Sequence, residues 1–234
     1  TGREFLEYAR HITATYHEME QFLYHASSQQ CIHIGASLTV GSFFLSDIIT
    51  GYEAENPNVN IRVYIDNSMN IIRKISEGTL DVAVIEGNVK TKDVIFKDIF
   101  EDEMVLICGK THPFAGRSSI NLTDLAGKAF VLREEGSGTR EFLTDLTENR
   151  GIPIVEKWIC HSSDSIINIV ASGQGVSILS KSLLRHHDEV NQIAINDFPL
   201  KRSFKIVYHK DKFLSTGLRK LIAGIENKFH SNTW

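Results

Sequence analysis

Residues 31–85 read CIHIGASLTVGSFFLSDIITGYEAENPNVNIRVYIDNSMNIIRKISEGTLDVAVI, and strand patterns alternate with helix patterns along this stretch. The runs at 31–36, 59–65 and 80–85 are typical of strands. The segments between them, 40–55 and 68–77, are predicted helices that end at Asn56-Pro57 and Gly78. A strand–helix–strand–helix–strand order predicts a mostly parallel sheet with right-handed crossovers, which is an α/β fold.

The remainder of the chain continues the plan. Two more strands are predicted at 94–99 and 103–108, before a break at 109–117. The second half repeats the alternation, with strands at 129–132, 155–160, 176–179, 192–195 and 203–210 and helices at 139–149, 164–172, 181–184 and 214–229. The prolines at 57, 113, 153 and 199 all fall between predicted elements, which supports these boundaries.

The charge balance and hydropathy exclude several classes of function. The 234 residues include 25 Lys+Arg and 29 Asp+Glu, and this acidic excess argues against phosphate contact as the main task of the chain. The longest apolar run, about 104–108, is far shorter than the ~20 residues of a membrane span. The chain opens on Thr-Gly-Arg-Glu-Phe without a secretory segment, so we expect a cytoplasmic piece of a longer protein with no membrane partner.

The cysteines and histidines predict neither a metal site nor a cofactor. Cys31, Cys108 and Cys160 are odd in number, far apart and set in strand-like runs. We expect reduced, buried thiols, with Cys160 near the candidate site described below. No group of histidines, cysteines and acids has the spacing of metal ligands.

The first segment, 2–26, is a predicted helix with a heptad seam. The seam residues recur in steps of four and three and are Phe5, Ala9, Ile12, Tyr16, Met19, Leu23 and Ala26. Such regularity favours a partner helix, although a helix laid on its own domain is the alternative. The polar break at 27–30 makes 1–28 an appended linker or dimerisation helix.

Small hydroxyl and glycine residues follow the predicted strands at their carboxyl ends, where ligands bind in open α/β sheets. They are Ser37-Leu38-Thr39, Asn67-Ser68, 136–140 (Gly-Ser-Gly-Thr-Arg) and Ser162-Ser163. Helix starts expose unpaired amides, so several of them together predict a site for a small anion, whereas each alone is also an ordinary N-cap.

Two side chains beside these helix starts carry more than one interpretation. Arg140 could clamp an anion bidentately, point to solvent, or pair with Glu135 or Glu141. His161 adjoins the same region, and we expect a ligand contact or a strand-end side chain rather than a catalytic base.

The chain resembles the effector-binding domain of LysR-type transcriptional regulators. The segments that carry the resemblance are CIHIGASLTVGSFFL (31–45), FLSDIITGYEAENPNV (44–59), IRKISEGTLDVAVIEG (72–87), FEDEMVLIC (100–108), HPFA (112–115), LAG (125–127), FVLREEGSGTR (130–140) and ASGQGVSIL (171–179). Together they cover 31 to about 229. The helix at 2–26 resembles the linker helix of that family, which pairs in dimers and joins the sensor to a winged helix-turn-helix. The sequence lacks that DNA-binding module.

The resemblance implies two Rossmann-like lobes, as in type 2 periplasmic binding proteins, after an N-terminal linker helix. Lobe I would hold 31–108 plus 208–234, lobe II would hold 109–207, and the ligand would sit between them. The family's ligand positions fall on Ser37, Leu38, Thr39, Ser68, Ile85, Glu86, Thr139, Ser162, Ser163, Gly175 and Val176. To these the local chemistry adds Arg140 and His161.

The resemblance also implies a function. We expect a ligand-sensing domain that binds a small anionic metabolite in a homodimer or homotetramer and contacts DNA only through the missing module. The alternative is a periplasmic-type solute-binding protein for a small anion. An enzyme is not expected, because 136–140 lacks both the P-loop lysine and the Gly-x-Ser-x-Gly spacing.

Overall fold

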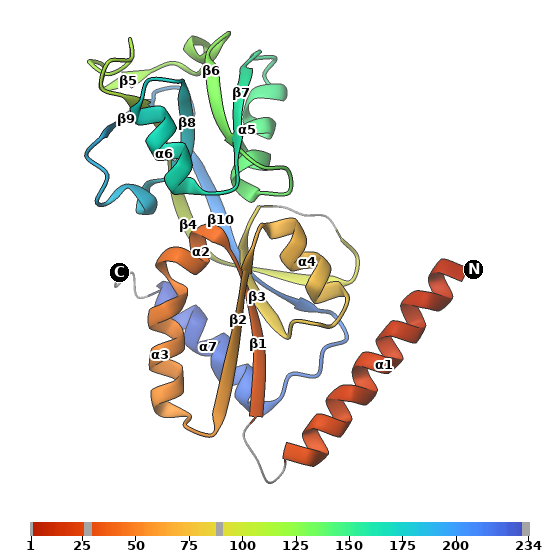
Figure 1. Ribbon diagram of the computed structural model, residues 1–234. Coiled ribbons are helices and arrows are strands. Elements are labelled where there is room, and N and C mark those ends of the chain that lie inside the picture. The colour runs from red at the N-terminus through yellow and green to blue at the C-terminus, as the bar shows by residue number, and fades with distance from the viewer. Residues whose placement is uncertain (1, 26–29, 88–90, 231–234) are drawn as a thin grey trace. The chain divides into compact units, whose positions relative to one another are not determined.

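The computed structural model describes residues 2–25, 30–87 and 91–230 (Figure 1). The chain divides into two compact units. Unit 1 is Thr1–Ile85, Val89–Phe100 and Lys205–Trp234, and unit 2 is Glu86–Asn88 and Glu101–Phe204. The chain passes between the units within β4 (Val94–Gly109) and β10 (Lys201–His209). The sequence places the first lobe boundary at 108/109, whereas the two units divide at 100/101.

Unit 1 contains the predicted parallel sheet. Strand β1 (Gln30–Ser37) pairs in parallel with β2 (Val59–Asp66) on one side and with β3 (Val82–Glu86) on the other. Helices α3 (Leu45–Glu55) and α7 (Thr216–His230) lie on one side of this sheet, and α4 (Ser68–Ser76) lies on the other (Figure 1). The α/β class is therefore confirmed, with the crossover order that the sequence predicted.

The helix predicted at 40–55 is two helices, α2 (Leu38–Phe43) and α3, which meet at Phe44. Phe44 is only 2% exposed, and its ring lies 6.1 Å from that of Phe100 and 5.4 Å from that of Phe229. The break occurs where this side chain enters an aromatic cluster. The two strands predicted at 94–99 and 103–108 are one continuous strand, β4.

Unit 2 is a mixed sheet with one helix on each face. Strand β6 (Ala129–Arg133) runs parallel to β7 (Val155–Cys160) and β8 (Val176–Ser180), whereas β4 runs antiparallel to β8 and β9 (Val190–Ile195). The short strand β5 (Ser119–Ile120) pairs with β9. The segments Leu122–Leu125 and Lys181–Leu184 are 3-10 helices.

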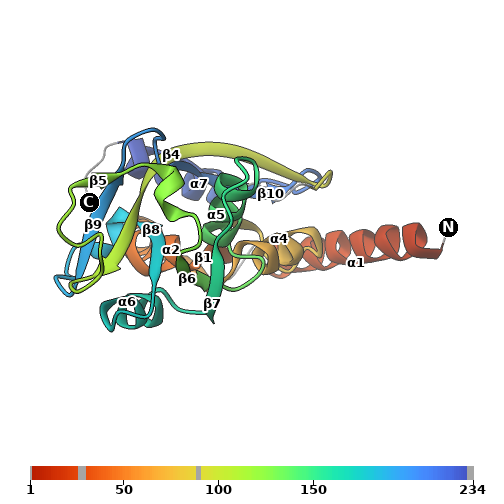
Figure 2. The same ribbon diagram turned by 90° about the horizontal axis from the view of Figure 1, so that it is seen from above.

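Helices α5 (Gly138–Glu148) and α6 (Ser163–Ala171) cover opposite faces of the unit 2 sheet (Figure 2). Leu143 of α5 packs in one core cluster with Phe130, and Ile167 of α6 packs in another with Val131. Successive residues of a strand point to opposite faces of the sheet, so the neighbours Phe130 and Val131 of β6 pack in different core clusters.

Helix α1 (Gly2–His25) confirms the predicted first helix as far as residue 25, while Ala26 and 27–29 of the polar break lie outside the described residues. The seam is exposed: Phe5 is 74%, Ile12 67% and Tyr16 56% exposed. A different face of α1 lies against unit 1, where the Ala14 Cβ is 3.1 Å from the position that a Cβ on Gly78 would occupy. The seam is therefore open to a partner while the helix also contacts its own domain.

Lys212 connects α1 to the sheet of unit 1. Its ammonium pairs with Glu18 of α1 and lies 2.7 Å from Asp81 Oδ1, while Asp81 Oδ2 accepts the backbone N–H of His33 at 2.6 Å. Burial lowers the pKa of Lys212, but the charges of Asp81 and Glu18 outweigh it and raise that pKa. Burial likewise raises the pKa of Asp81, and the hydrogen bond from His33 and the Lys212 charge lower it overall. Both groups are thus held in their charged forms.

Among residues 2–25, 30–87 and 91–230, no helix combines the length and apolar character that a membrane crossing requires.

Candidate functional site

The candidate residues of unit 1 gather at the carboxyl ends of its parallel strands. The register places Ser37 beside Asp66, and Ala36 beside Val84, so β1 and β2 end level with each other. Helices α2 and α4 begin directly after these two strands, at Leu38 and Ser68. Within the set, Ser37, Thr39, Ser68 and Ile85 are buried, and Leu38 is half-buried.

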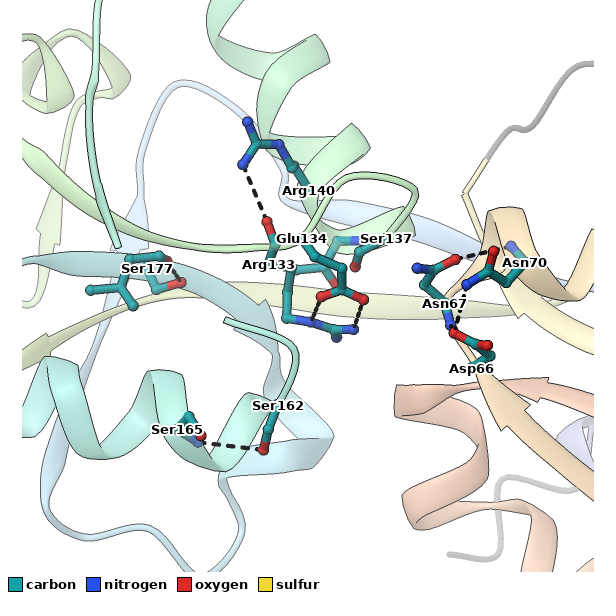
Figure 3. A network of polar contacts seen from close by, with 12 residues as sticks. Asp66, Asn67, Asn70, Arg133, Glu134, Ser137, Arg140, Ser162, Ser165 and Ser177 are labelled. Carbon is teal, nitrogen blue, oxygen red and sulfur yellow. Dashed lines mark hydrogen bonds and ion pairs between the residues drawn. The ribbon is translucent and has the colours of Figure 1, made fainter. Parts of the chain in front are cut away.

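The start of α4 is fixed by a carboxylate that sequence analysis did not single out. Asp66 Oδ1 accepts the backbone N–H of Asn67 at 2.7 Å and the side-chain amide of Asn70 at 3.0 Å (Figure 3). Asn67 caps the helix by accepting the Asn70 N–H at 2.9 Å. Burial raises the pKa of Asp66, but these hydrogen bonds outweigh it and lower that pKa. The carboxylate of Asp66 at the end of β2 is therefore held in its ionised form.

Within unit 2 the start of α5 is packed directly on Glu86. A Cβ on Gly138 would lie 2.4 Å from the carbonyl oxygen of Glu86, so only glycine permits this approach. Ser137 caps the helix by accepting the Thr139 N–H at 3.3 Å. The close contact brings two predicted residues, Glu86 and Thr139, to one place.

Arg202 joins these two residues through a buried network that sequence analysis missed. Its Nη1 donates to Thr139 Oγ1 at 2.9 Å and lies 3.7 Å from Glu86 Oε1, and its Nε donates to Asp102 Oδ2 at 2.8 Å. Asp102 Oδ1 also accepts the Ser180 hydroxyl at 2.7 Å. The Arg202, Glu86 and Asp102 side chains are 4%, 2% and 1% exposed, so desolvation makes their pairing obligatory.

A signal for this network was present in the strand alternation. Asp102 alternates with the buried Met104 and Leu106 along β4, and Arg202 alternates with the buried Phe204 along β10, so each charged residue is on the buried face of its strand. A charged residue on the buried face of each of two strands marks a buried ion pair.

A second buried pair lies at the carboxyl end of β6. Arg133 donates from Nε and Nη2 to both carboxylate oxygens of Glu134, each at 2.8 Å (Figure 3). The two side chains are 1% and 8% exposed, and Arg133 Nη1 is buried with no hydrogen-bond partner among the described residues. A buried guanidinium donor of this kind normally has a partner, which makes Arg133 Nη1 a candidate contact for a ligand or a water.

Arg140 pairs with a residue of the neighbouring strand. Its Nη2 pairs with Glu156 Oε1 at 2.8 Å, and its Nη1 donates to the carbonyl oxygen of Arg133 at 3.3 Å. Glu156 was not among the partners that the sequence offered, because it lies on β7, beside β6 in the sheet and distant in the sequence. The role of Arg140 toward an anion stays a prediction.

The residues after β7 lie at the same end of the unit 2 sheet as Arg133. Arg133 is paired with Cys160, and His161, Ser162 and Ser163 follow directly. Ser162 caps α6 by accepting the Ser165 N–H at 3.5 Å, whereas His161 is exposed (Figure 3). The thiol of Cys160 is free, and burial raises its pKa.

Gly175 and Val176 lie at the other end of this sheet. Val176 is paired with Phe130 in parallel strands, which places it at the amino end of β8, about 10 Å along β6 from Arg133. Gly175 is needed there because a Cβ would lie 2.5 Å from the carbonyl oxygen of Ala129. The structure does not bring these two residues to the starts of α5 and α6.

Comparisons with known proteins agree with this architecture. The family model described as LysR substrate binding domain matches residues 25–229. The HTH-type transcriptional regulator CysL of Bacillus subtilis is 30% identical over 213 residues, which is 89% of this chain and 71% of that protein.

Solved structures show the same fold. The regulatory domain of CcmR from Synechocystis PCC6803, in complex with 2-PG, has a TM-score of 0.80 at 22% identity and covers 88% of this chain and 99% of its own. The effector-binding domain of QuiR, in complex with shikimate, has a TM-score of 0.80 at 18% identity, with 88% and 100% covered. With the family model spanning residues 25–229 and a relative aligned over most of its length, this chain belongs to the LysR substrate-binding domain family.

Proposed function

We propose that this chain is the effector-sensing part of a transcriptional regulator and that it binds a small anion at the polar helix starts that follow its strands. The observation that carries the proposal is a set of four polar residues at helix starts: Ser37 and Ser68 lie at strand ends of unit 1, and Thr139 and Ser162 lie after strands of unit 2. CcmR with 2-PG and QuiR with shikimate support a small-molecule ligand for this fold. The units would form the two lobes that the family resemblance implies.

The chemistry of these positions supports an anion. Helices α4, α5 and α6 each have at least nine residues, and their first turns offer backbone N–H donors and a positive dipole end. The buried Nη1 of Arg133 adds a charged donor. In contrast, the buried carboxylates of Glu86 and Asp102 are already opposed by Arg202. A carboxylate or phosphate-like group would complement the remaining donors.

The output of the sensor would pass through α1. Its exposed seam supports pairing with α1 of a second copy in a homodimer, or in a homotetramer built from two such dimers. The chain spans 71% of the length of CysL, which leaves room for an N-terminal winged helix-turn-helix. Effector binding would shift the population of lobe arrangements and so the spacing of DNA-binding modules. A regulator of this type acts in the cytoplasm and carries out no reaction of its own.

A thermal-shift screen against small anions tests the proposal, using the wild type and the double variant Ser37→Ala, Thr39→Ala. A ligand at 100 times its Kd stabilises the folded state by about 2.7 kcal/mol, which raises Tm by several degrees. The double variant should lose this shift. The matched control, Ser46→Ala with Thr50→Ala, removes two exposed hydroxyls of α3 and should keep it. Equal shifts in all three proteins would contradict the assignment.

A further inference from the structure

Three side chains that can ligate a metal lie close together where α1 contacts the rest of unit 1. His11 Nε2 is 3.9 Å from Asp211 Oδ2, and His209 Nδ1 is 3.9 Å from the same oxygen. One ligand atom from each of the three residues lies within 4.8 Å of the other two. His11 is distant from the other two in sequence, so no motif spacing could reveal the group.

The ring of His209 presents an acceptor nitrogen toward Asp211. His209 Nδ1 accepts the backbone N–H of Asp211 at 3.2 Å, so its lone pair would turn from this N–H to an ion that binds there. A neutral imidazole is the form that coordinates a metal.

The surroundings leave room for an ion and its water. The three side chains line a cavity of about 620 Å3, together with Glu7 of α1. Glu7 precedes His11 by one helical turn, so the two residues share a face of α1. Two of the cations lining the cavity already have acidic partners, since Lys210 pairs with Asp93 and Lys212 pairs with Glu18 and Asp81. Arg10, Arg73 and Glu77 also line it.

We propose that His11, His209 and Asp211 form a site for a divalent transition-metal ion of the zinc type, which ties α1 to the rest of unit 1. Two imidazole nitrogens and a carboxylate oxygen are a ligand set that zinc and its neighbours accept, with water or Glu7 in the fourth position. Tetrahedral ligands at ~2.0 Å from an ion lie about 3.3 Å apart. The atoms therefore need to close in by less than 1 Å for the two 3.9 Å pairs, which side-chain rotation can supply.

Cobalt(II) is the probe, because it takes zinc sites and absorbs visible light there. The chain is freed of metal with EDTA, dialysed and titrated with Co2+, and Zn2+ is then used to displace the cobalt. The wild type should bind one Co2+ with a visible absorption band that Zn2+ abolishes. His11→Ala and Asp211→Asn should each weaken binding at least about tenfold, as expected for the loss of a ligand.

The control is His17→Ala, which removes an exposed histidine of the same helix that pairs with Glu20 and lies outside the cluster. Its Co2+ affinity should equal that of the wild type. Zn2+ should also slow the hydrogen exchange of α1 amides in the wild type and in His17→Ala, but not in His11→Ala. The proposal is overturned if the wild type shows no band, if His11→Ala or Asp211→Asn binds as tightly as the wild type, if His17→Ala loses binding equally, or if α1 exchange is unaffected by Zn2+.

Discussion

Replacing Arg202 by Met should destabilise unit 2 by about 3–5 kcal/mol, the cost of leaving a buried charge without its partner. The magnitude follows from the burial, since Asp102 and Glu86 are 1% and 2% exposed and both face the guanidinium. Asp102 would keep only its hydrogen bond from Ser180. With a urea dependence of about 2 kcal/mol/M, the unfolding midpoint should fall by about 2 M.

The adjacent residue supplies the control. Lys201 pairs with Glu101 at 2.6 Å, but both side chains are more than half exposed, so Lys201→Met should leave the midpoint nearly unchanged. Urea unfolding followed by circular dichroism and by tryptophan fluorescence measures both variants. Equal midpoints for the two variants would refute the reasoning, because burial would then make no difference to the cost of losing a cation.

A second substitution separates the lost charge from lost packing. Adding Asp102→Leu to Arg202→Met removes the buried carboxylate that lost its ion pair with Arg202 and should recover part of the lost stability. The coupling between the two sites should be about 0.5–3 kcal/mol, the range for residues in direct contact. If the double variant were less stable than Arg202→Met by the full cost of Asp102→Leu alone, the pair would not interact as described.

Three further predictions concern other parts of the chain. The pKa of Asp81 is lowered, so its contribution to stability is present above about pH 3.9, the unfolded value, and is lost as pH falls through the lower folded value. The pKa of Lys212 is raised, so its contribution is present below about pH 10.4 and is lost as pH rises through the higher folded value. The urea midpoints of the wild type and of Lys212→Met as a function of pH measure both contributions. Gly138→Ala should cost about 1–3 kcal/mol, because its Cβ would collide with the carbonyl oxygen of Glu86, and an unchanged Tm would show that the contact is looser. Ile12→Glu on the exposed seam should shift the chain toward monomer in sedimentation while leaving its circular dichroism unchanged, and an unaltered oligomer would remove the seam from the interface.

The fold could be predicted because its signals are local. The alternation of strands and helices, with helix ends at Asn56-Pro57 and Gly78, predicts the parallel sheet of unit 1 without information on any long-range contact. The errors in the elements arose from tertiary packing. The helix at 40–55 breaks at Phe44 because that ring joins Phe100 and Phe229, which are distant in sequence.

The candidate site was only partly predictable. Residues that follow strand ends, such as Thr139 and Ser162, can be located from the sequence because the topology of an α/β sheet fixes where they lie. Partners cannot be located in this way. Glu156 reaches Arg140 across neighbouring strands, and Arg202 reaches Thr139 from a distant strand, so both contacts depend on sheet order. Gly175 was assigned by resemblance, but the register places it at the opposite end of the sheet.

The central claim is that a small anion binds at the polar helix starts. Hydrogen exchange with and without an anion that raises Tm tests it most directly. Slower exchange is expected at 37–39, 138–140 and 162–164. Protection found only outside these segments would contradict the claim.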